Sequence, residues 1–271
     1  LDLGAEGGAD DAVDPAAVRL GHDDIAALWP VPGPEDDKYS RGVLGIDTGS
    51  DRYPGAAVLP VTGAVYSGAG MIRFTGPDRL ADLILHKLPS VTVGSGRVEA
   101  WLVGCGWSEE GAEQRFGPIL ESGVPLVIDA DALRYLPKRL PEGSLLTPHA
   151  GELAELLGIS RPEVEDDPVG KAYEAAERWE TTVLLKGATQ YIANPFEKRV
   201  TLAIAGPSWT AQAGSGDVLA GICGTLLAAG LPAPKAEALA ASVQAMAAAR
   251  KPGPFPPDVV AQAIPEVLVH L

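Results

Sequence analysis

The sequence predicts a three-layer α/β/α protein in which helices cover both faces of a mostly parallel sheet. Short apolar runs typical of buried strands alternate with helical patterns along most of the chain, as expected for parallel strands joined by helices. Glycine and polar residues recur directly after these runs, where parallel sheets bind ligands. The chain has 271 residues, 46% of them hydrophobic, which suits one large domain with a sizeable core.

Residues 1–37 differ in composition from the rest of the chain. They are acidic and rich in Gly, Ala and Pro, and we interpret them as a linker or N-terminal extension before a domain of residues 38–271. One short helix is expected over residues 22–29, because Asp23 or Asp24 can begin it and Pro30 ends it. Within this segment, Leu28 and Trp29 are the residues expected to dock on the domain if any do.

The domain is expected to open with a strand, a helix and a second strand. The strands are predicted at residues 43–46 and 71–74, and a helix of small residues at 56–70 follows a glycine-containing loop at 47–55. That loop lacks the G-x-G-x-x-G spacing, and the Walker pattern G-x-x-x-x-G-K-[ST] is absent from the whole sequence. An ordinary Rossmann dinucleotide site or P-loop is therefore not expected.

The alternation continues to the end of the chain. Later strands are predicted at residues 100–104, 125–129, 144–147 and 181–185, and a hairpin at 191–193 and 200–204. Helices are predicted at residues 110–121, up to 157, 171–179, from the glycine turn at 214 onward, 234–249 and 257–271.

The most informative stretch is the glycine turn before the apolar helix near the end of the chain. Gly214, Ser215 and Gly216 precede Asp217 there. The first turn of a helix has N–H groups without partners and the positive end of the dipole, so it binds anions such as phosphate. A carboxylate beside phosphate is useful as a proton acceptor for an attacking hydroxyl. From the local pattern alone, Asp217 is also compatible with an ordinary helix N-cap.

Polar side chains recur at the ends of other predicted strands, including Asp129, Asp131, His149 and Lys186. Each has a plain structural explanation: a helix cap, a helix start or a solvated charge. Because the carboxyl ends of parallel strands meet at one edge, their repeated occurrence predicts a functional site there.

Charge and cysteine content exclude several classes of function. The formal net charge of −15 argues against nucleic acid or an anionic membrane as a partner, so an anionic substrate must be held by local N–H donors and a few cations. Cys105 and Cys223 are too few for a disulfide framework and lie in apolar sequence, as expected in a reducing compartment. No apolar run is long enough to span a membrane and no signal peptide is recognisable, so we expect a cytoplasmic protein.

Six segments occur in the order seen in NAD(P)H-hydrate dehydratases, which this chain resembles from about residue 37 to at least residue 230. They are Lys38, SDRYPGAA at 50–57, DADAL at 129–133, LTPHAGE at 146–152, LKGA at 185–188 and GSGDVLAG at 214–221. The last three together are the specific part. The resemblance implies a ribokinase-like fold. Residues 1–4 and 29–33 also resemble the linker of bifunctional members, which carry an epimerase domain upstream.

The resemblance implies a metabolite-repair activity on NADH and NADPH that have taken up water. ADP or ATP, with Mg²⁺, would phosphorylate the ring hydroxyl, which is then lost as phosphate because phosphate is a better leaving group than hydroxide. Asp217 is implied as the base that takes the hydroxyl proton. The implied anion hole and nucleotide site comprise Gly214, Ser215, Gly216, Lys186, Gly187, Ala188, Thr189 and Gln190. The implied site for the hydrated dinucleotide comprises Tyr53, Gly55, Ala56, Gly106, Asp131, His149 and Asp217; no residue is assigned as a metal ligand.

The sequence departs from the family at one wall of this site, where GCGWS at residues 104–108 replaces the usual G-P-G-L-G. Trp107 is larger than the residue it replaces and therefore puts that wall in question. A second departure, Thr189-Gln190 after the nucleotide turn, is expected to shift phosphate contacts by one residue. Two alternatives remain: a kinase of the same fold acting on hydroxymethylpyrimidine, a thiazole or a sugar, and a non-catalytic nucleotide-binding sensor. We also expect a homo-oligomer and functional pairing with an NAD(P)HX epimerase.

Overall fold

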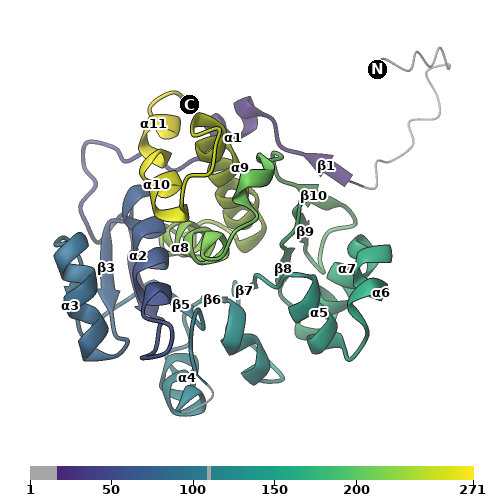
Figure 1. Ribbon diagram of the computed structural model, residues 1–271, viewed down its shortest axis with the longest axis horizontal. Helices are drawn as coiled ribbons and strands as arrows, with labels where there is room; N and C mark the ends of the chain where they lie inside the picture. The colour runs from purple at the N-terminus through teal and green to yellow at the C-terminus, as the bar shows by residue number, and fades with distance from the viewer. Residues whose placement is uncertain (1–16, 109–110) are drawn as a thin grey trace.

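The computed structural model describes residues 17–108 and 111–271 and shows a central sheet with helices on both faces (Figure 1). Within these residues the strand order is β1-β10-β9-β8-β7-β6-β5-β2-β3-β4. All neighbouring strands are parallel except β9, which runs antiparallel to both β8 and β10. The predicted three-layer, mostly parallel architecture is confirmed, and so is the hairpin of β9 and β10.

The central strands are buried along their whole length, which explains their continuous apolar runs. The strands are β1 (Ala17–Arg19), β2 (Val43–Asp47), β3 (Met71–Phe74), β4 (Thr92–Val93), β5 (Ala100–Val103), β6 (Leu126–Ile128), β7 (Leu145–Leu146), β8 (Thr182–Leu185), β9 (Tyr191–Ala193) and β10 (Val200–Leu202).

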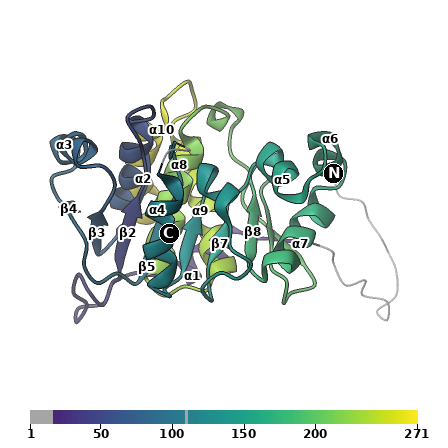
Figure 2. The same cartoon turned by 90° about the horizontal axis from the view of Figure 1, so that it is seen from below.

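Helices α2, α8 and α9 cover one face of the sheet, and α4, α5 and α7 cover the other (Figures 1 and 2). The α-helices are α1 (His22–Leu28), α2 (Gly55–Tyr66), α3 (Asp78–Lys87), α4 (Ala112–Glu121), α5 (Ala150–Leu157), α6 (Arg161–Asp166), α7 (Pro168–Trp179), α8 (Ser215–Ala228), α9 (Ala233–Arg250), α10 (Pro257–Gln262) and α11 (Ile264–Leu268). Two 3₁₀ helices, η1 (Ala130–Tyr135) and η2 (Ser208–Thr210), follow β6 and β10.

Several elements differ from the sequence-based expectation. Strands β1 and β4 and helices α3 and α6 were not anticipated, and the single helix expected over residues 257–271 is two helices, α10 and α11. Pro265 lies in the first turn of α11, where its missing N–H stops the first helix from continuing. The helix expected over residues 110–121 begins at Ala112; residue 110 itself lies outside the described residues.

Part of the N-terminal segment packs against the domain. Strand β1 pairs with β10 at the edge of the sheet, and α1 inserts Ile25, which is fully buried, into the main core. Trp29 is 8% exposed and belongs to the same core, as expected if this end of the segment docks. Residues 1–16, including the linker-like residues 1–4, lie outside the described residues. The boundary between residues 37 and 38 stays a prediction.

Helices α2 and α8 approach each other closely enough for their backbones to touch. A Cβ added at Gly221 of α8 would lie 2.0 Å from the carbonyl oxygen of Pro60 in α2, and one at Gly63 would lie 2.3 Å from the oxygen of Val218. Only glycine permits such an approach. This contact fixes the first turn of α8 relative to the loop that leads into α2.

Candidate active site

The predicted site residues follow β2, β5, β6, β7 and β8, whose carboxyl ends share one edge of the sheet, and meet the start of α8 there. Helix α8 has Gly214 as its N-cap, with φ = 90°, and no side chain caps it. Asp217 is the third residue of the helix, so the alternative that it is an ordinary N-cap is wrong. The glycine supplies the left-handed backbone that opens the helix toward the site.

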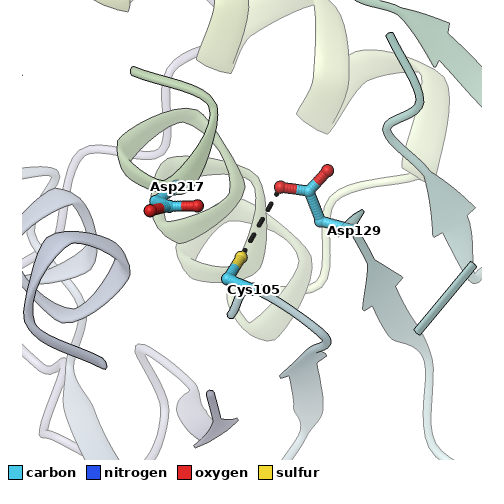
Figure 3. Close-up of side chains that lie close together, drawn as sticks. All are labelled: Cys105, Asp129 and Asp217. Atoms are coloured by element: carbon cyan, nitrogen blue, oxygen red, sulfur yellow. Dashed lines mark hydrogen bonds between the residues drawn. The ribbon is translucent and has the colours of Figure 1, made fainter. Parts of the chain in front are cut away.

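Asp217 lies in a buried group with Asp129 and Cys105 (Figure 3). Ligand atoms of the three side chains lie within 4.8 Å of one another, and Asp129 is only 1% exposed. The Cys105 thiol donates to Asp129 Oδ2 over 3.5 Å. Two carboxylates this close in a buried setting cannot both carry charge without cost.

This environment raises the pKa of Asp217 to about 6. Burial is the largest cause, the Asp129 charge adds to it, and Lys186 opposes both. A carboxylate with this pKa is ionised at neutral pH and is a stronger base than an exposed aspartate. Burial also raises the pKa of the Cys105 thiol, with Asp129 and Asp217 adding to the effect, so this cysteine stays protonated.

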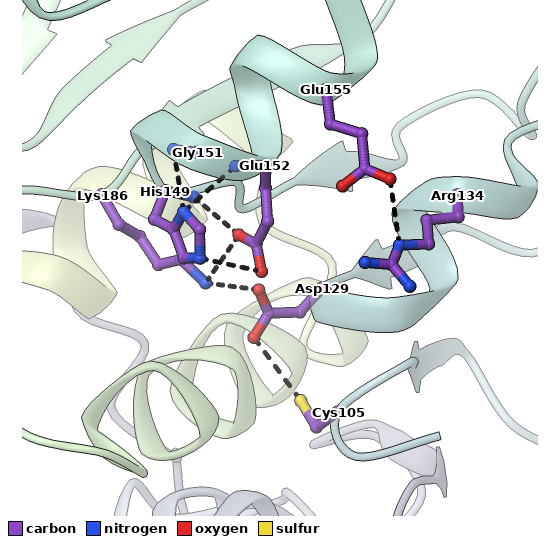
Figure 4. A network of polar contacts seen from close by, with 8 residues as sticks. All are labelled: Cys105, Asp129, Arg134, His149, Gly151, Glu152, Glu155 and Lys186. Atoms are coloured by element: carbon purple, nitrogen blue, oxygen red, sulfur yellow. Dashed lines mark hydrogen bonds and ion pairs between the residues drawn. The ribbon is translucent and has the colours of Figure 1, made fainter. Parts of the chain in front are cut away.

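Lys186 lies beside Asp129 and Glu152 (Figure 4). Its Nζ lies 2.5 Å from Asp129 Oδ1 and 3.9 Å from Glu152 Oε2, and a Cβ added at Gly216 would lie 3.4 Å from it. Burial alone would lower the pKa of Lys186, but Asp129 and Glu152 outweigh it and raise that pKa. Lys186 is therefore a permanent positive charge beside the glycine turn, which suits it to hold phosphate rather than to move protons.

His149 caps the start of α5, which is the structural explanation that its position in the sequence allowed. Its Nδ1 accepts hydrogen bonds from the N–H groups of Gly151 and Glu152, at 3.0 and 3.1 Å, and the N–H of His149 donates in return to Glu152 Oε2 (Figure 4). This reciprocal cap begins α5. The ring therefore carries its proton on Nε2 when neutral, and its side chain remains 58% exposed at the site.

One pocket of about 530 Å³ brings most of the expected nucleotide residues together. Lys186, Gly187, Ala188 and Gln190 line one side and Ser215 and Gly216 another, with His149 at the same pocket. Thr189 instead faces a neighbouring pocket of about 610 Å³ beside Arg161. Sequence reasoning did not identify the remaining wall, which includes Gly206, Pro207, Ser208, Thr210, Ala211, Gln212 and Gln244.

Gln244 illustrates why that wall was missed. Its Nε2 donates to the carbonyl oxygen of Ser215 over 2.7 Å, so it supports the glycine turn from α9. Nothing in the local pattern of an alanine-rich helix distinguishes this position, because the contact exists only once α8 and α9 have packed.

The residues expected to hold the hydrated dinucleotide divide into separate groups. Gly106, with φ = 62°, abuts Tyr53 and Ala56: a Cβ on it would lie 2.4 Å from Ala56 Cβ and 3.0 Å from Tyr53 Cβ. Gly55 is exposed at the start of α2 in the same loop. Cys105, the residue before Gly106, lies within 4.8 Å of Asp217, which links this group to the Asp217 site through one residue of the chain.

Asp131 belongs to a different cavity. It lines a pocket of about 400 Å³ with Arg134, Glu155 and Trp179, whereas Asp129 faces Lys186. Between the two aspartates, Ala130 has φ = 49°, in the left-handed region, so the backbone turns and their side chains part. Asp129 was noted as a strand-end residue but was not among the predicted site residues.

The chemistry of the site suits a divalent cation accompanying a nucleotide. Asp129 and Asp217 offer carboxylate oxygens, the donors that Mg²⁺ prefers, while the protonated Cys105 does not.

Among the described residues no helix is both long and apolar enough to cross a bilayer.

Comparisons with known proteins identify the same family that the sequence motifs resemble. Residues 44–267 match the family model described as NAD(P)H-hydrate dehydratase. The bifunctional NAD(P)H-hydrate repair enzyme Nnr of Mycobacterium tuberculosis is 45% identical over 226 residues, covering 79% of this chain and 47% of that protein. The chain therefore spans about half the length of this bifunctional relative. The ADP-dependent (S)-NAD(P)H-hydrate dehydratase of Neisseria meningitidis is 32% identical, with 73% of each protein covered.

Among solved structures, the ADP/ATP-dependent NAD(P)H-hydrate dehydratase of Bacillus subtilis, co-crystallised with ATP and Mg²⁺, superimposes with a TM-score of 0.85. It is 26% identical, and the match covers 92% of this chain and 97% of that one. A ribokinase-like superfamily protein of Enterococcus faecalis has a TM-score of 0.86 at 19% identity, covering 97% and 99%. These matches confirm the predicted ribokinase-like fold.

Proposed function

This chain belongs to the NAD(P)H-hydrate dehydratase family, and we propose that it restores NADH and NADPH from their (S)-hydrates in a reaction that consumes ADP or ATP. The observation that carries the proposal is the position of Asp217. Its carboxylate, with a pKa of about 6, directly follows Ser215 and Gly216, which line the nucleotide pocket. It also lies within 4.8 Å of Cys105, whose neighbour Gly106 abuts Tyr53 and Ala56. A base between a phosphoryl donor and a hydroxylated substrate is what the reaction requires.

In the first step, Asp217 accepts the proton of the ring hydroxyl while that oxygen attacks the terminal phosphorus of the nucleotide. A new oxygen–phosphorus bond forms and the bond to the nucleotide's bridging oxygen breaks. In the second step the ring carbon–oxygen bond breaks, phosphate leaves with the electron pair, and loss of a proton from the neighbouring ring carbon restores the double bond.

The phosphates are held mainly by the backbone in this proposal. Ser215 and Gly216, in the first turn of α8 after the N-cap Gly214, line the pocket, where N–H groups and the positive end of the dipole would attract phosphate. Lys186 adds a charge that Asp129 orients. Such local donors allow a protein of net charge −15 to bind a polyanion.

The nucleotide pocket is completed by Gly187, Ala188 and Gln190. We propose that Thr189, which lines the adjoining pocket, makes a further contact with the nucleotide. His149 and Asp131 stay proposed contacts of the hydrate at the outer parts of the edge. Mg²⁺ would arrive with the nucleotide and neutralise phosphate charge, with the Asp129 carboxylate as the oxygen donor beside it, so that Asp217 stays available as the base.

Bifunctional relatives are named as NAD(P)H-hydrate repair enzymes, and we propose that this chain acts together with an NAD(P)HX epimerase activity. A cytoplasmic location and a homo-oligomeric assembly stay predictions from the sequence.

The test is direct. The protein is incubated with hydrated NADH or NADPH, Mg²⁺ and either ADP or ATP, and the near-ultraviolet absorbance of the restored dihydronicotinamide is followed. Restored cofactor together with stoichiometric phosphate release supports the proposal. Phosphate transfer to a pyrimidine, thiazole or sugar alcohol without cofactor repair would instead favour a small-molecule kinase. Absence of repair with both nucleotides would refute the proposed function.

A further inference from the structure

A buried polar cluster lies beneath the loops that carry the proposed hydrate-binding group. It consists of Asp47, the last residue of β2, Trp107 in the loop after β5, and Arg115 in α4. Asp47 is 6% exposed and Trp107 is 1% exposed. Trp107, the residue that departs from the family pattern, is therefore a buried support under the site.

Arg115 binds both the side chain of Asp47 and the backbone beyond it. Its Nε donates to Asp47 Oδ1 over 2.8 Å, its Nη2 lies 2.5 Å from the same oxygen, and its Nη1 donates to the carbonyl oxygen of Gly49 over 3.0 Å. A planar guanidinium can make these contacts together, whereas a lysine ammonium has no matching fork.

Trp107 ties the second loop to the same aspartate. Its indole N–H donates to the carbonyl oxygen of Asp47 over 2.9 Å and to Oδ1 over 3.1 Å. The Arg115 guanidinium lies over its ring at 4.9 Å, and Phe116 packs against it edge-on at a centroid distance of 5.8 Å. The ring therefore contacts two consecutive side chains of α4.

Stability alone does not explain why a charged pair occupies this position. Burial raises the pKa of Asp47 and the Arg115 charge opposes this shift, so the ion pair forms against a desolvation cost. Apolar side chains of similar volume commonly stabilise a core as well as a buried ion pair does. Directional bonds from two donors to one carboxylate do what apolar packing cannot: they set the relative position of two loops.

These two loops are the ones that meet at the proposed substrate wall. The N–H of Gly49 donates to the carbonyl oxygen of Cys105 over 2.7 Å, and the carbonyl of the same glycine accepts from Arg115. One residue further, Gly106 abuts Tyr53 and Ala56 with no room for a Cβ. A small shift of either loop would therefore open or block this contact.

We propose that Asp47, Trp107 and Arg115 are positioning residues that hold the loops at residues 48–56 and 104–107 in the arrangement that binds the hydrated ring. The inference rests on the proposed function for the identity of the ligand. The three residues act through Gly106, Tyr53 and Ala56. Loosening them lowers the fraction of molecules ready to bind hydrate, so the apparent affinity falls in proportion to that fraction.

The experiment compares Trp107→Phe, which keeps an aromatic ring but replaces the indole and removes its N–H, with Arg115→Met and Arg115→Lys. If the competent arrangement falls to about a tenth of the population, the KM for hydrate rises about tenfold while kcat and the KM for nucleotide change by less than about twofold. Arg115→Lys keeps the charge beside Asp47 and is expected to lie between Arg115→Met and the wild type. Arg178→Met is the matched control, because Arg178 also lies over a tryptophan ring and donates to a backbone carbonyl, but on α7.

A second measurement does not depend on turnover. Amide hydrogen exchange on the free variants is expected to accelerate in peptides covering residues 48–56 and 104–107 and to stay unchanged in α8 and α9. If the wild type repairs no hydrate but the exchange pattern appears, the proposed function fails and the positioning role stands. Unchanged hydrate KM and unchanged exchange in folded Trp107→Phe and Arg115→Lys, or an equal KM rise in Arg178→Met, would overturn the inference.

Discussion

The raised pKa of Asp217 predicts a specific pH dependence of repair. A carboxylate with a pKa of about 6 is about one-tenth ionised at pH 5, whereas one at the ordinary value of 3.8 is more than nine-tenths ionised there. If Asp217 must be ionised to accept the hydroxyl proton, kcat/KM for hydrate should fall about tenfold between pH 7 and pH 5. The assay is the initial rate of cofactor restoration across this range, with nucleotide and Mg²⁺ saturating.

The terminal phosphate of a nucleotide also titrates near pH 6, so the wild-type profile needs an internal control. Asp129→Asn provides it. Asp129 is the second cause of the raised Asp217 pKa and the principal partner of Lys186, so its neutralisation removes a repulsion and leaves the Lys186 charge to stabilise the Asp217 carboxylate. Both effects lower the pKa of Asp217. The acid limb should therefore move to lower pH, whereas a limb due to the nucleotide would stay in place.

The maximum rate of Asp129→Asn is expected to fall as well, because Lys186 loses its orientation. Only the position of the limb tests the electrostatic reasoning. An acid limb that lies near pH 4 in the wild type, or that does not move in a folded Asp129→Asn protein binding nucleotide normally, would refute the assignment of Asp217 as the titrating base.

Four further outcomes are expected. Asp217→Asn should lower turnover by about two to four orders of magnitude, and near wild-type turnover would remove Asp217 from the mechanism. The same variant should raise the melting temperature by a few degrees at pH 8, because the raised folded-state pKa means that ionised Asp217 costs stability above pH 6. Glu237 is fully buried in α9, and burial raises its pKa well above the usual value. The stability contributed by its protonated form is therefore lost as pH rises from about 4.5 through the folded pKa. Glu237→Gln should reduce the difference in melting temperature between pH 5 and pH 8, and an unchanged difference would contradict this. Ala56→Trp should raise the KM for hydrate more than the KM for nucleotide, and the reverse ranking would mean that the two pockets are exchanged. Ile25→Ala should cost about 2–4 kcal/mol in thermal or denaturant unfolding, because the side chain is fully buried in the core, and an unchanged midpoint would show that α1 contributes nothing to the fold.

The order of strands and helices was predictable from sequence because it depends on local periodicity. Buried parallel strands require continuous apolar runs, and β2, β3, β5, β6 and β8 each appeared where such a run predicted one. Short edge elements such as β1 and β4 were not predictable, because two or three residues carry no period and exist as strands only through their neighbours.

Asp217 and the glycine turn before it were also identifiable by sequence alone. A helix start without a capping side chain, rich in glycine and carrying a carboxylate, is a local pattern with a local chemical meaning. The same holds for Lys186 and the turn that follows it, since both lie directly after a strand whose apolar run is unmistakable.

Only the tertiary structure decided which residues surround Asp217. Asp129 and Asp131 are two positions apart and would point the same way in an extended strand, but the left-handed backbone of Ala130 directs one to Lys186 and the other to a separate cavity. Trp107 is buried on Asp47 because Arg115, from another helix, completes its environment. Sequence determines what each segment can form by itself, and contacts between segments far apart in the chain determine the pKa of Asp217, the proposed base, and the positions of the loops around it.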